Sequence, residues 1–153
     1  MTEIKRGSLA TSDVSSTSYI EFLADAKFLA SVGEFIRRNA EIAGFSPHEA
    51  NSIELAIDEM VSNAISHGYE NKPEGKVKIT LGLSDESMTI ILEESGKYFN
   101  PAEVQEPDKN APLEERKIGG LGLFIVRDIM DEVYFDIIDE KIKRFTLIKK
   151  LKK

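Results

Sequence analysis

Two oxygen-bearing side chains lie four residues apart in a segment with helical periodicity. Glu59 and Asn63 therefore project from the same face of the expected helix. A carboxylate can orient or deprotonate a hydroxyl nucleophile, and an amide oxygen is a neutral ligand suited to magnesium that already bears phosphate oxygens. Polar residues on helices are also commonly solvated surface residues. The spacing alone leaves both interpretations open.

A second acidic residue, Glu94, ends a predicted apolar strand, and Gly96 follows it by two residues. A carboxylate at the end of a strand can accept a hydrogen bond from an exocyclic amine. A glycine close to it lets a flat ring approach the backbone. A tight turn is the alternative interpretation of the same residues.

A glycine-rich segment precedes another predicted helix, with Gly119, Gly120, Leu121 and Gly122 in sequence. Backbone N–H groups and the positive end of a helix dipole favour anions at such a place. The pattern G-x-x-x-x-G-K-[ST] is missing, and the strand and acid of a dinucleotide-binding fingerprint do not flank the segment. The segment by itself indicates no more than a possible anion site.

Hydrophobic periodicity and capping residues predict the elements that position these groups. The expected helices cover 25–44, 46–68 and 123–130, and the expected strands cover 19–23, 76–83, 88–94, 133–138 and 142–151. The order of these elements predicts an α+β two-layer sandwich, a mixed β-sheet with helices packed on one face.

Two stretches fall outside these elements. Residues 1–18, rich in Ser and Thr from residue 8, are expected to form a loosely ordered lead-in to a single domain over 19–153. Residues 95–118 carry three prolines and have no strand or helix period, which is typical of a lid.

Composition narrows the classes of protein. The chain has 153 residues, of which 41% are hydrophobic, and a formal charge of −7, so one domain with a sizeable core is expected. Cys is absent, which excludes disulfides, thiol nucleophiles and Cys-containing zinc sites. No signal peptide or membrane-length apolar run is apparent, so a cytoplasmic location without membrane contact is expected.

The basic residues gather near one end of the sequence. Residues 141–153 carry seven Lys or Arg and no acid. Their alternation with apolar residues predicts an edge-exposed strand in preference to a phosphate-tracking arm. No direct binding of nucleic acid is therefore expected.

Taken in order, the three motifs resemble the ATP-binding fold of gyrase, Hsp90, histidine kinases and MutL, and within it the bacterial anti-sigma-factor serine kinases. The segment ELAIDEMVSNAISHGY at 54–69 is similar to the N-box of that subfamily. The segment GGLGLFIVR at 119–127 is similar to its second glycine box, and MDEV at 130–133 continues the similarity. The resemblance covers 19–151, nearly the whole chain.

The resemblance implies ATP and Mg²⁺ as cofactors. It implies that Asn63 binds the metal, that Glu59 is the base or orienting carboxylate, and that the residues after Asn100 up to Ile118 cover the nucleotide. The remaining expected nucleotide contacts are Glu94, Gly96, Gly119, Gly120, Leu121, Gly122 and Thr146. The family normally has Asp where this chain has Glu94.

The function implied is that of a serine/threonine-protein kinase. It would transfer the γ-phosphoryl of ATP to a small antagonist protein, sequester a sigma factor and form a homodimer. The alternative is a nucleotide-regulated or nucleotide-free binding module without kinase activity. The presence of both Glu59 and Asn63 favours the kinase.

Overall fold

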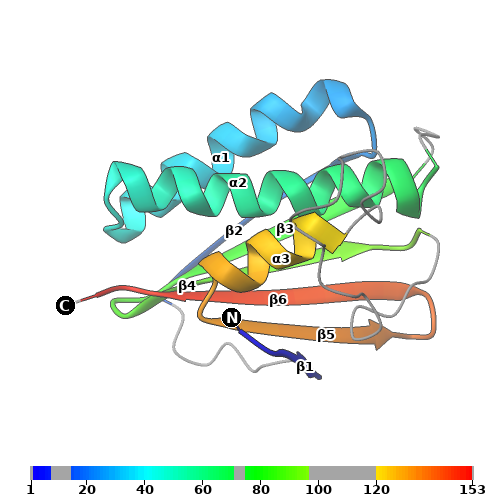
Figure 1. The fold of residues 1–153 in the computed structure, drawn as a ribbon. Coiled ribbons are helices and arrows are strands. Elements are labelled where there is room, and N and C mark those ends of the chain that lie inside the picture. Colours follow the sequence, from blue (N-terminus) through cyan, green and yellow to red (C-terminus); the bar gives the residue numbers. More distant parts are fainter. Residues whose placement is uncertain (1, 8–14, 71–74, 97–119, 153) are drawn as a thin grey trace, which may run out of the picture.

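The computed structural model describes residues 2–7, 15–70, 75–96 and 120–152 (Figure 1). Their elements are, in chain order, β1 (Ile4–Arg6), β2 (Ser16–Leu23), the 3₁₀-helix η1 (Ala26–Phe28), α1 (Leu29–Ala43), α2 (Pro47–Asn63), the π-helix η2 (Ala64–Gly68), β3 (Lys76–Leu83), β4 (Ser87–Glu94), α3 (Gly120–Ile129), β5 (Glu132–Ile138) and β6 (Ile142–Lys150).

The strands form one sheet in the order β1-β5-β6-β4-β3-β2. β1 pairs in parallel with β5, and the other pairs are antiparallel. Helices α1, α2 and α3 lie on one side of this sheet (Figure 1). The predicted α+β two-layer sandwich with a mixed sheet is therefore confirmed.

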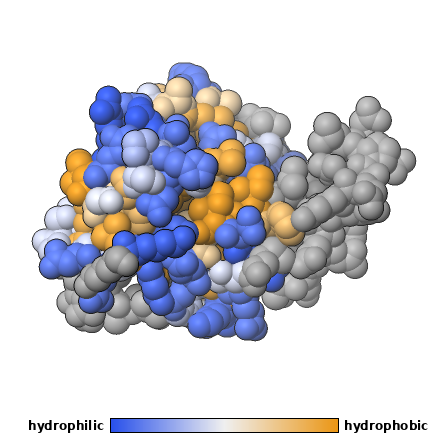
Figure 2. Space-filling view, turned by 60° about the vertical axis from the view of Figure 1, so that its left-hand side comes forward, coloured by the Kyte–Doolittle hydropathy of each residue, from blue (hydrophilic) through white to orange (hydrophobic). Residues whose placement is uncertain are grey.

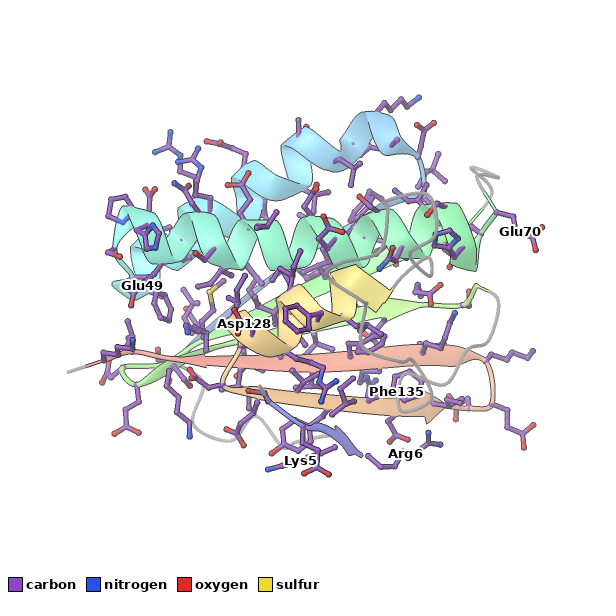
Figure 3. All side chains as sticks on the ribbon, in the orientation of Figure 1. Lys5, Arg6, Glu49, Glu70, Asp128 and Phe135 are labelled. Atoms are coloured by element: carbon purple, nitrogen blue, oxygen red, sulfur yellow. The ribbon has the colours of Figure 1, made fainter. Side chains whose placement is uncertain are left out.

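Local signals set the helix boundaries. The Asp25 side chain accepts a hydrogen bond from the Lys27 amide at the start of η1, and Gly44 ends α1 at a φ of 111°. A capping box opens α2: Ser46 accepts from the Glu49 amide, and the Glu49 carboxylate accepts from the Ser46 amide (Figure 3). The predicted helix starts therefore agree with the structure within a few residues.

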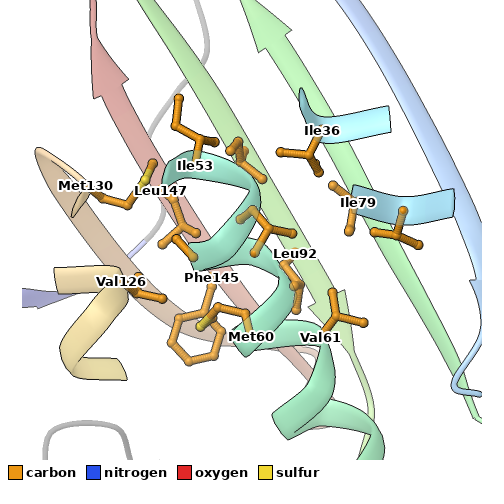
Figure 4. Close-up of a cluster of buried hydrophobic side chains, with 14 of the residues drawn as sticks. Ile36, Ile53, Met60, Val61, Ile79, Leu92, Val126, Met130, Phe145 and Leu147 are labelled. Atoms are coloured by element: carbon orange, nitrogen blue, oxygen red, sulfur yellow. The ribbon is translucent and has the colours of Figure 1, made fainter. Parts of the chain in front are cut away.

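The core fills the space between helices and sheet. Met60 from α2 and Val126 from α3 lie with Phe145 and Leu147 from β6 in one cluster (Figure 4). All four side chains are at most 5% exposed. Burial of such side chains contributes about 1.5–3 kcal/mol each. This packing fixes α3 against α2, and with it the start of α3.

The N-terminal region differs from the prediction. Ile4–Arg6 forms β1, and β2 begins at Ser16, whereas the sequence predicts a loosely ordered lead-in over 1–18. The Arg6 guanidinium lies 5.5 Å from the ring centroid of Phe135 on β5, at the edge shown in Figure 3. β1 has three residues, too few for a two-residue period to identify it.

The prediction that the basic segment is an edge strand is wrong. β6 lies between β5 and β4, inside the sheet. Neighbouring groups compensate its charges: Arg144 pairs with Glu93 at 2.9 Å, Lys150 with Glu132 at 3.7 Å, and the Lys149 ammonium donates to a backbone carbonyl. A charged strand can therefore be central when its neighbours carry the opposite charge.

Large hydrophobic side chains are also exposed. Tyr19, Leu23, Ile42 and Leu55 are each more than 40% exposed. On the face drawn in Figure 2, hydrophobic areas lie among hydrophilic ones. No helix among the described residues is both long and apolar enough to cross a membrane.

Candidate functional site

The packing of α3 on α2 brings three predicted site residues together. A Cβ atom at Gly122 would lie 2.6 Å from the Asn63 amide nitrogen and 3.4 Å from a Glu59 carboxylate oxygen. Only glycine permits so close an approach. The first turn of α3 therefore faces both polar side chains of α2, and its positive dipole end lies beside them.

The environment of Glu59 changes its acidity. Burial raises the pKa of the Glu59 carboxyl, and the charge of neighbouring Asp58 raises the same pKa further. A raised pKa brings a carboxylate closer to the value that suits proton transfer near neutral pH. Perturbed acids of this kind are concentrated at functional sites.

The helix changes its form immediately after Asn63. α2 ends at Asn63 and continues as the π-helix η2, in which the Ser66 hydroxyl donates to the Ser62 carbonyl at 2.8 Å. Single π-turns inside helices occur frequently at functional sites. His67 is exposed in this turn, and no role for it follows from its position.

Glu94 lies at the end of β4, buried and ion-paired. Its Oε1 is 2.7 Å from the Lys143 Nζ, and the two side chains are 4% and 3% exposed. Its Oε2 accepts a hydrogen bond from the Gly96 amide at 2.8 Å. The carboxylate is therefore held by two donors.

The end of η2 contacts the turn after β4. A Cβ atom at Gly96 would lie 2.6 Å from the Gly68 backbone, and one at Gly68 would lie 3.0 Å from Glu94 Oε2. The Tyr69 hydroxyl donates to the Lys76 carbonyl and accepts from the Ser95 amide, each at 2.8 Å. These contacts hold the C-terminal end of η2 over Glu94.

A scan against family models matches residues 22–149 to the histidine kinase-like ATPase domain. The chain belongs to this family. The sequence-based recognition is therefore confirmed, and the α2–η2 region and the start of α3 lie within the matched part of the ATPase domain.

Curated relatives include serine-protein kinase RsbW of Oceanobacillus iheyensis, 25% identical over 78% of this chain and 80% of that protein. Serine-protein kinase RsbW of Bacillus velezensis is 24% identical over 77% and 78%. Among solved structures, the RsbU and RsbW domains of Rv1364c from Mycobacterium tuberculosis match with a TM-score of 0.58 and 18% identity, over 88% of this chain and 32% of that one. The structural likeness supports the fold.

The ATPase-domain residues present fit a magnesium–phosphate group. An amide oxygen and a carboxylate are hard donors, which magnesium prefers, and magnesium usually takes its remaining ligands from water and substrate phosphates. The described residues contain no cluster of three or more His, Asp or Glu that could hold a metal by itself. Asn63 is the residue of this chain expected to hold the ion.

The expected contact of Thr146 with the nucleotide needs correction. Thr146 is buried opposite Ile91 and Tyr134, whereas Lys143 lies opposite Glu94. Because successive residues of a strand point to opposite faces, Thr146 points away from the helices, and Lys143 points with Glu94 toward them. The thickness of the sheet separates Thr146 from the other candidate residues.

Part of the predicted site falls outside the described residues. These are Gly119 and the lid expected before it. Gly120 and Leu121 are the first residues of α3, so their backbone amides lie at the start of the helix, where the anion-site hypothesis places them. Conversely, the sequence motifs did not include Lys143. Its signal was available, because alternation places Lys143, like Lys149, on the same strand face as Phe145 and Leu147.

Gly122→Ala is expected to weaken Mg-ATP binding about tenfold or more while the protein stays folded. The new methyl group would displace the Asn63 amide, which is the flexible end of a side chain. Calorimetric titration measures the affinity. Gly33→Ala on α1 is the matched control, since its Cβ would likewise meet a flexible side-chain end, Glu54 Oε1, at 2.7 Å. Equal losses in both variants would contradict the site assignment.

Proposed function

We propose that this protein is an ATP-dependent serine/threonine kinase of the anti-sigma-factor type. Its substrate is a small antagonist protein, and between phosphorylation events it sequesters a sigma factor. The contact of Glu59, Asn63 and Gly122 carries the proposal, because it joins a base, a metal ligand and an anion-binding helix start. The printed names of the curated relatives, serine-protein kinase RsbW, support the same reaction class.

The side chains of the site divide the work of phosphoryl transfer. The attacking serine oxygen forms a bond to the γ-phosphorus while the bond from that phosphorus to the β-bridging oxygen breaks and ADP leaves. Glu59 accepts the hydroxyl proton, and the first amides of α3 bind the phosphate oxygens. Magnesium, when bound through Asn63, neutralises phosphate charge. Such catalysis depends mainly on positioning and electrostatics.

Other parts of the proposal concern the assembly. A homodimer, a cytoplasmic location and the absence of nucleic-acid and membrane partners belong to it. The expected absence of a nucleic-acid partner is supported by the pairing of the basic side chains of β6, which have acidic partners on neighbouring strands or, for Lys149, the Ile129 carbonyl of α3.

A second candidate is a partner-binding module without kinase activity. The observation that favours it is the Glu94–Lys143 ion pair, because the carboxylate expected to read adenine already has two donors. The two candidates differ in an assay of purified protein with radiolabelled ATP, Mg²⁺ and the antagonist. Transfer of label to a serine supports the kinase, and its absence with intact partner binding supports the module.

Asn63→Ala is expected to remove the magnesium-dependent part of ATP affinity, about tenfold, because the alanine has no oxygen ligand. Calorimetry with and without Mg²⁺ measures it. Asn51→Ala is the matched control, since Asn51 is an exposed residue of the same helix. If Asn63→Ala keeps the magnesium dependence of the wild type, Asn63 is not the ligand.

A further inference from the structure

We infer that Lys143 is a specificity-determining residue for adenine, which donates to the ring nitrogen N1 while Glu94 accepts from the N6 amine. The inference rests on the proposed function, in that a purine nucleotide must bind at this end of β4. It assigns the second half of base recognition to a residue of β6, which the sequence motifs do not include.

The two side chains form a fixed unit. Lys143 and Glu94 are Cα partners in the β4–β6 register and point to the same face of the sheet. Their charged atoms are 2.7 Å apart, and the side chains are 3% and 4% exposed. Shielding from water strengthens the attraction between them, so the pair keeps one geometry.

The surroundings orient the carboxylate. Gly96 donates its amide to Glu94 Oε2 at 2.8 Å, so that the lysine lies on the Oε1 side. Gly68 and Gly96 approach the same carboxylate without any side chain of their own. The pair therefore presents an acceptor and a cationic donor in a set order below the end of η2.

This order matches the hydrogen-bonding edge of adenine. Adenine offers a donor, the N6 amine, next to an acceptor, N1. Guanine offers the reverse, an acceptor at O6 next to a donor at N1. A carboxylate accepts only and an ammonium donates only, so the pair cannot adapt by exchanging roles. A site built to pair with one edge rejects the other because buried polar groups would lose their partners.

The extra length of Glu94 is consistent with this arrangement. At this position the resembled family has Asp, whose carboxylate would lie one methylene closer to the strand. The longer side chain reaches both the Lys143 ammonium and the Gly96 amide. The Asp of the family and the Glu94 of this chain can each present an acceptor to the amine. In this chain the paired Lys143 adds a donor.

Nucleotide analogues test the inference on the wild-type protein. Calorimetric titrations compare ATP with 1-deaza-ATP, in which C–H replaces N1, and with 7-deaza-ATP as the matched control. We expect 1-deaza-ATP to bind about ten- to a hundredfold more weakly than ATP, the value of one charge-assisted hydrogen bond. We expect 7-deaza-ATP to bind within about twofold of ATP, and GTP at least as weakly as 1-deaza-ATP.

The Lys143→Met variant links the effect to the residue. It should bind ATP more weakly and should no longer distinguish ATP from 1-deaza-ATP. Equal affinity of wild type for ATP and 1-deaza-ATP would overturn the inference, as would a variant that still discriminates between them. If the variant does not fold, the ratio measured on the wild type decides.

Failure of the inference can be told apart from failure of the proposed function. Protein that binds Mg-ATP and phosphorylates its antagonist, yet binds 1-deaza-ATP equally well, retains the proposed function and loses only the role of Lys143. Protein that binds none of the triphosphates overturns both.

Discussion

Glu59→Gln is expected to lower the rate of phosphoryl transfer about a hundredfold or more and to leave Mg-ATP affinity within about threefold. The amide keeps the shape of the side chain but cannot accept the hydroxyl proton, and general bases contribute roughly this factor. Single-turnover transfer of label from ATP to the antagonist measures the rate. Glu54→Gln is the matched control, because Glu54 lies on the same helix but pairs with Arg37 at 3.4 Å.

The pH dependence of the transfer rate should report the ionisation of Glu59. Burial and Asp58 raise the pKa of Glu59, so the base form should be lost on acidification at a higher pH than for an ordinary glutamate. The rate of the wild type should fall as the pH decreases through that raised value, and the residual rate of Glu59→Gln should lack this inflection. If the wild-type rate instead falls only in the pH range where an ordinary glutamate titrates, another residue is the base.

As the pH rises, the ionisation of Glu59 should increase the rate of transfer but decrease the stability of the fold. Because the folded state raises the pKa of Glu59, the stabilising contribution is present at low pH and is lost as the pH rises through the folded value. Charged Glu59 therefore opposes folding near neutral pH. Glu59→Gln should be at least as stable as the wild type in urea, which separates lost catalysis from unfolding.

Lys143→Met is expected to lower the free energy of unfolding by about 3–5 kcal/mol, because it leaves the Glu94 carboxylate buried with its ion-pair partner removed. Urea denaturation followed by circular dichroism measures it. Lys141→Met, at an exposed position before the same strand, is the control and should change stability by less than about 0.5 kcal/mol.

The double variant Glu94→Met with Lys143→Met should recover most of that loss. Replacing a buried ion pair by apolar residues of similar volume is often neutral for stability. It should still bind nucleotide poorly, because the inference above assigns contact with the base to both replaced side chains. A single Lys143→Met variant as stable as the wild type would mean that the buried pair has no effect on folding.

The sequence predicted the helices well because their signals are local. The cap at Ser46, the helix stop at Gly44 and the four-residue spacing of Glu59 and Asn63 each depend on a few neighbouring residues. The contact of Gly122 with Asn63 depends instead on how α3 packs on α2. Spacing along the chain cannot give that contact, and only the family resemblance pointed to it.

The strand errors have different physical causes. The central position of β6 was not predicted because its basic residues are typical of a solvent-exposed edge strand. Their acidic partners, such as Glu93, are distant in sequence. The face of Thr146 was available from alternation alone, since Phe145 and Leu147 point to the core. Alternation also places Lys143 on the face of Phe145 and Leu147, but its buried partner Glu94 is distant in sequence, and only the folded sheet brings the two together.

The order of the strands also affects how the protein is made. β6 pairs with β4 in the middle of the sheet, yet residues 142–150 follow β4 by about fifty positions in the sequence. During synthesis, β4 therefore leaves the ribosome with one side unpaired. The interval between the synthesis of β1 and that of its partner β5 is longer still. An unpaired apolar strand edge is prone to aggregate. Nascent chains that stop before β6 should therefore depend on chaperones, and the helix–hairpin half should not be recoverable as a soluble fragment.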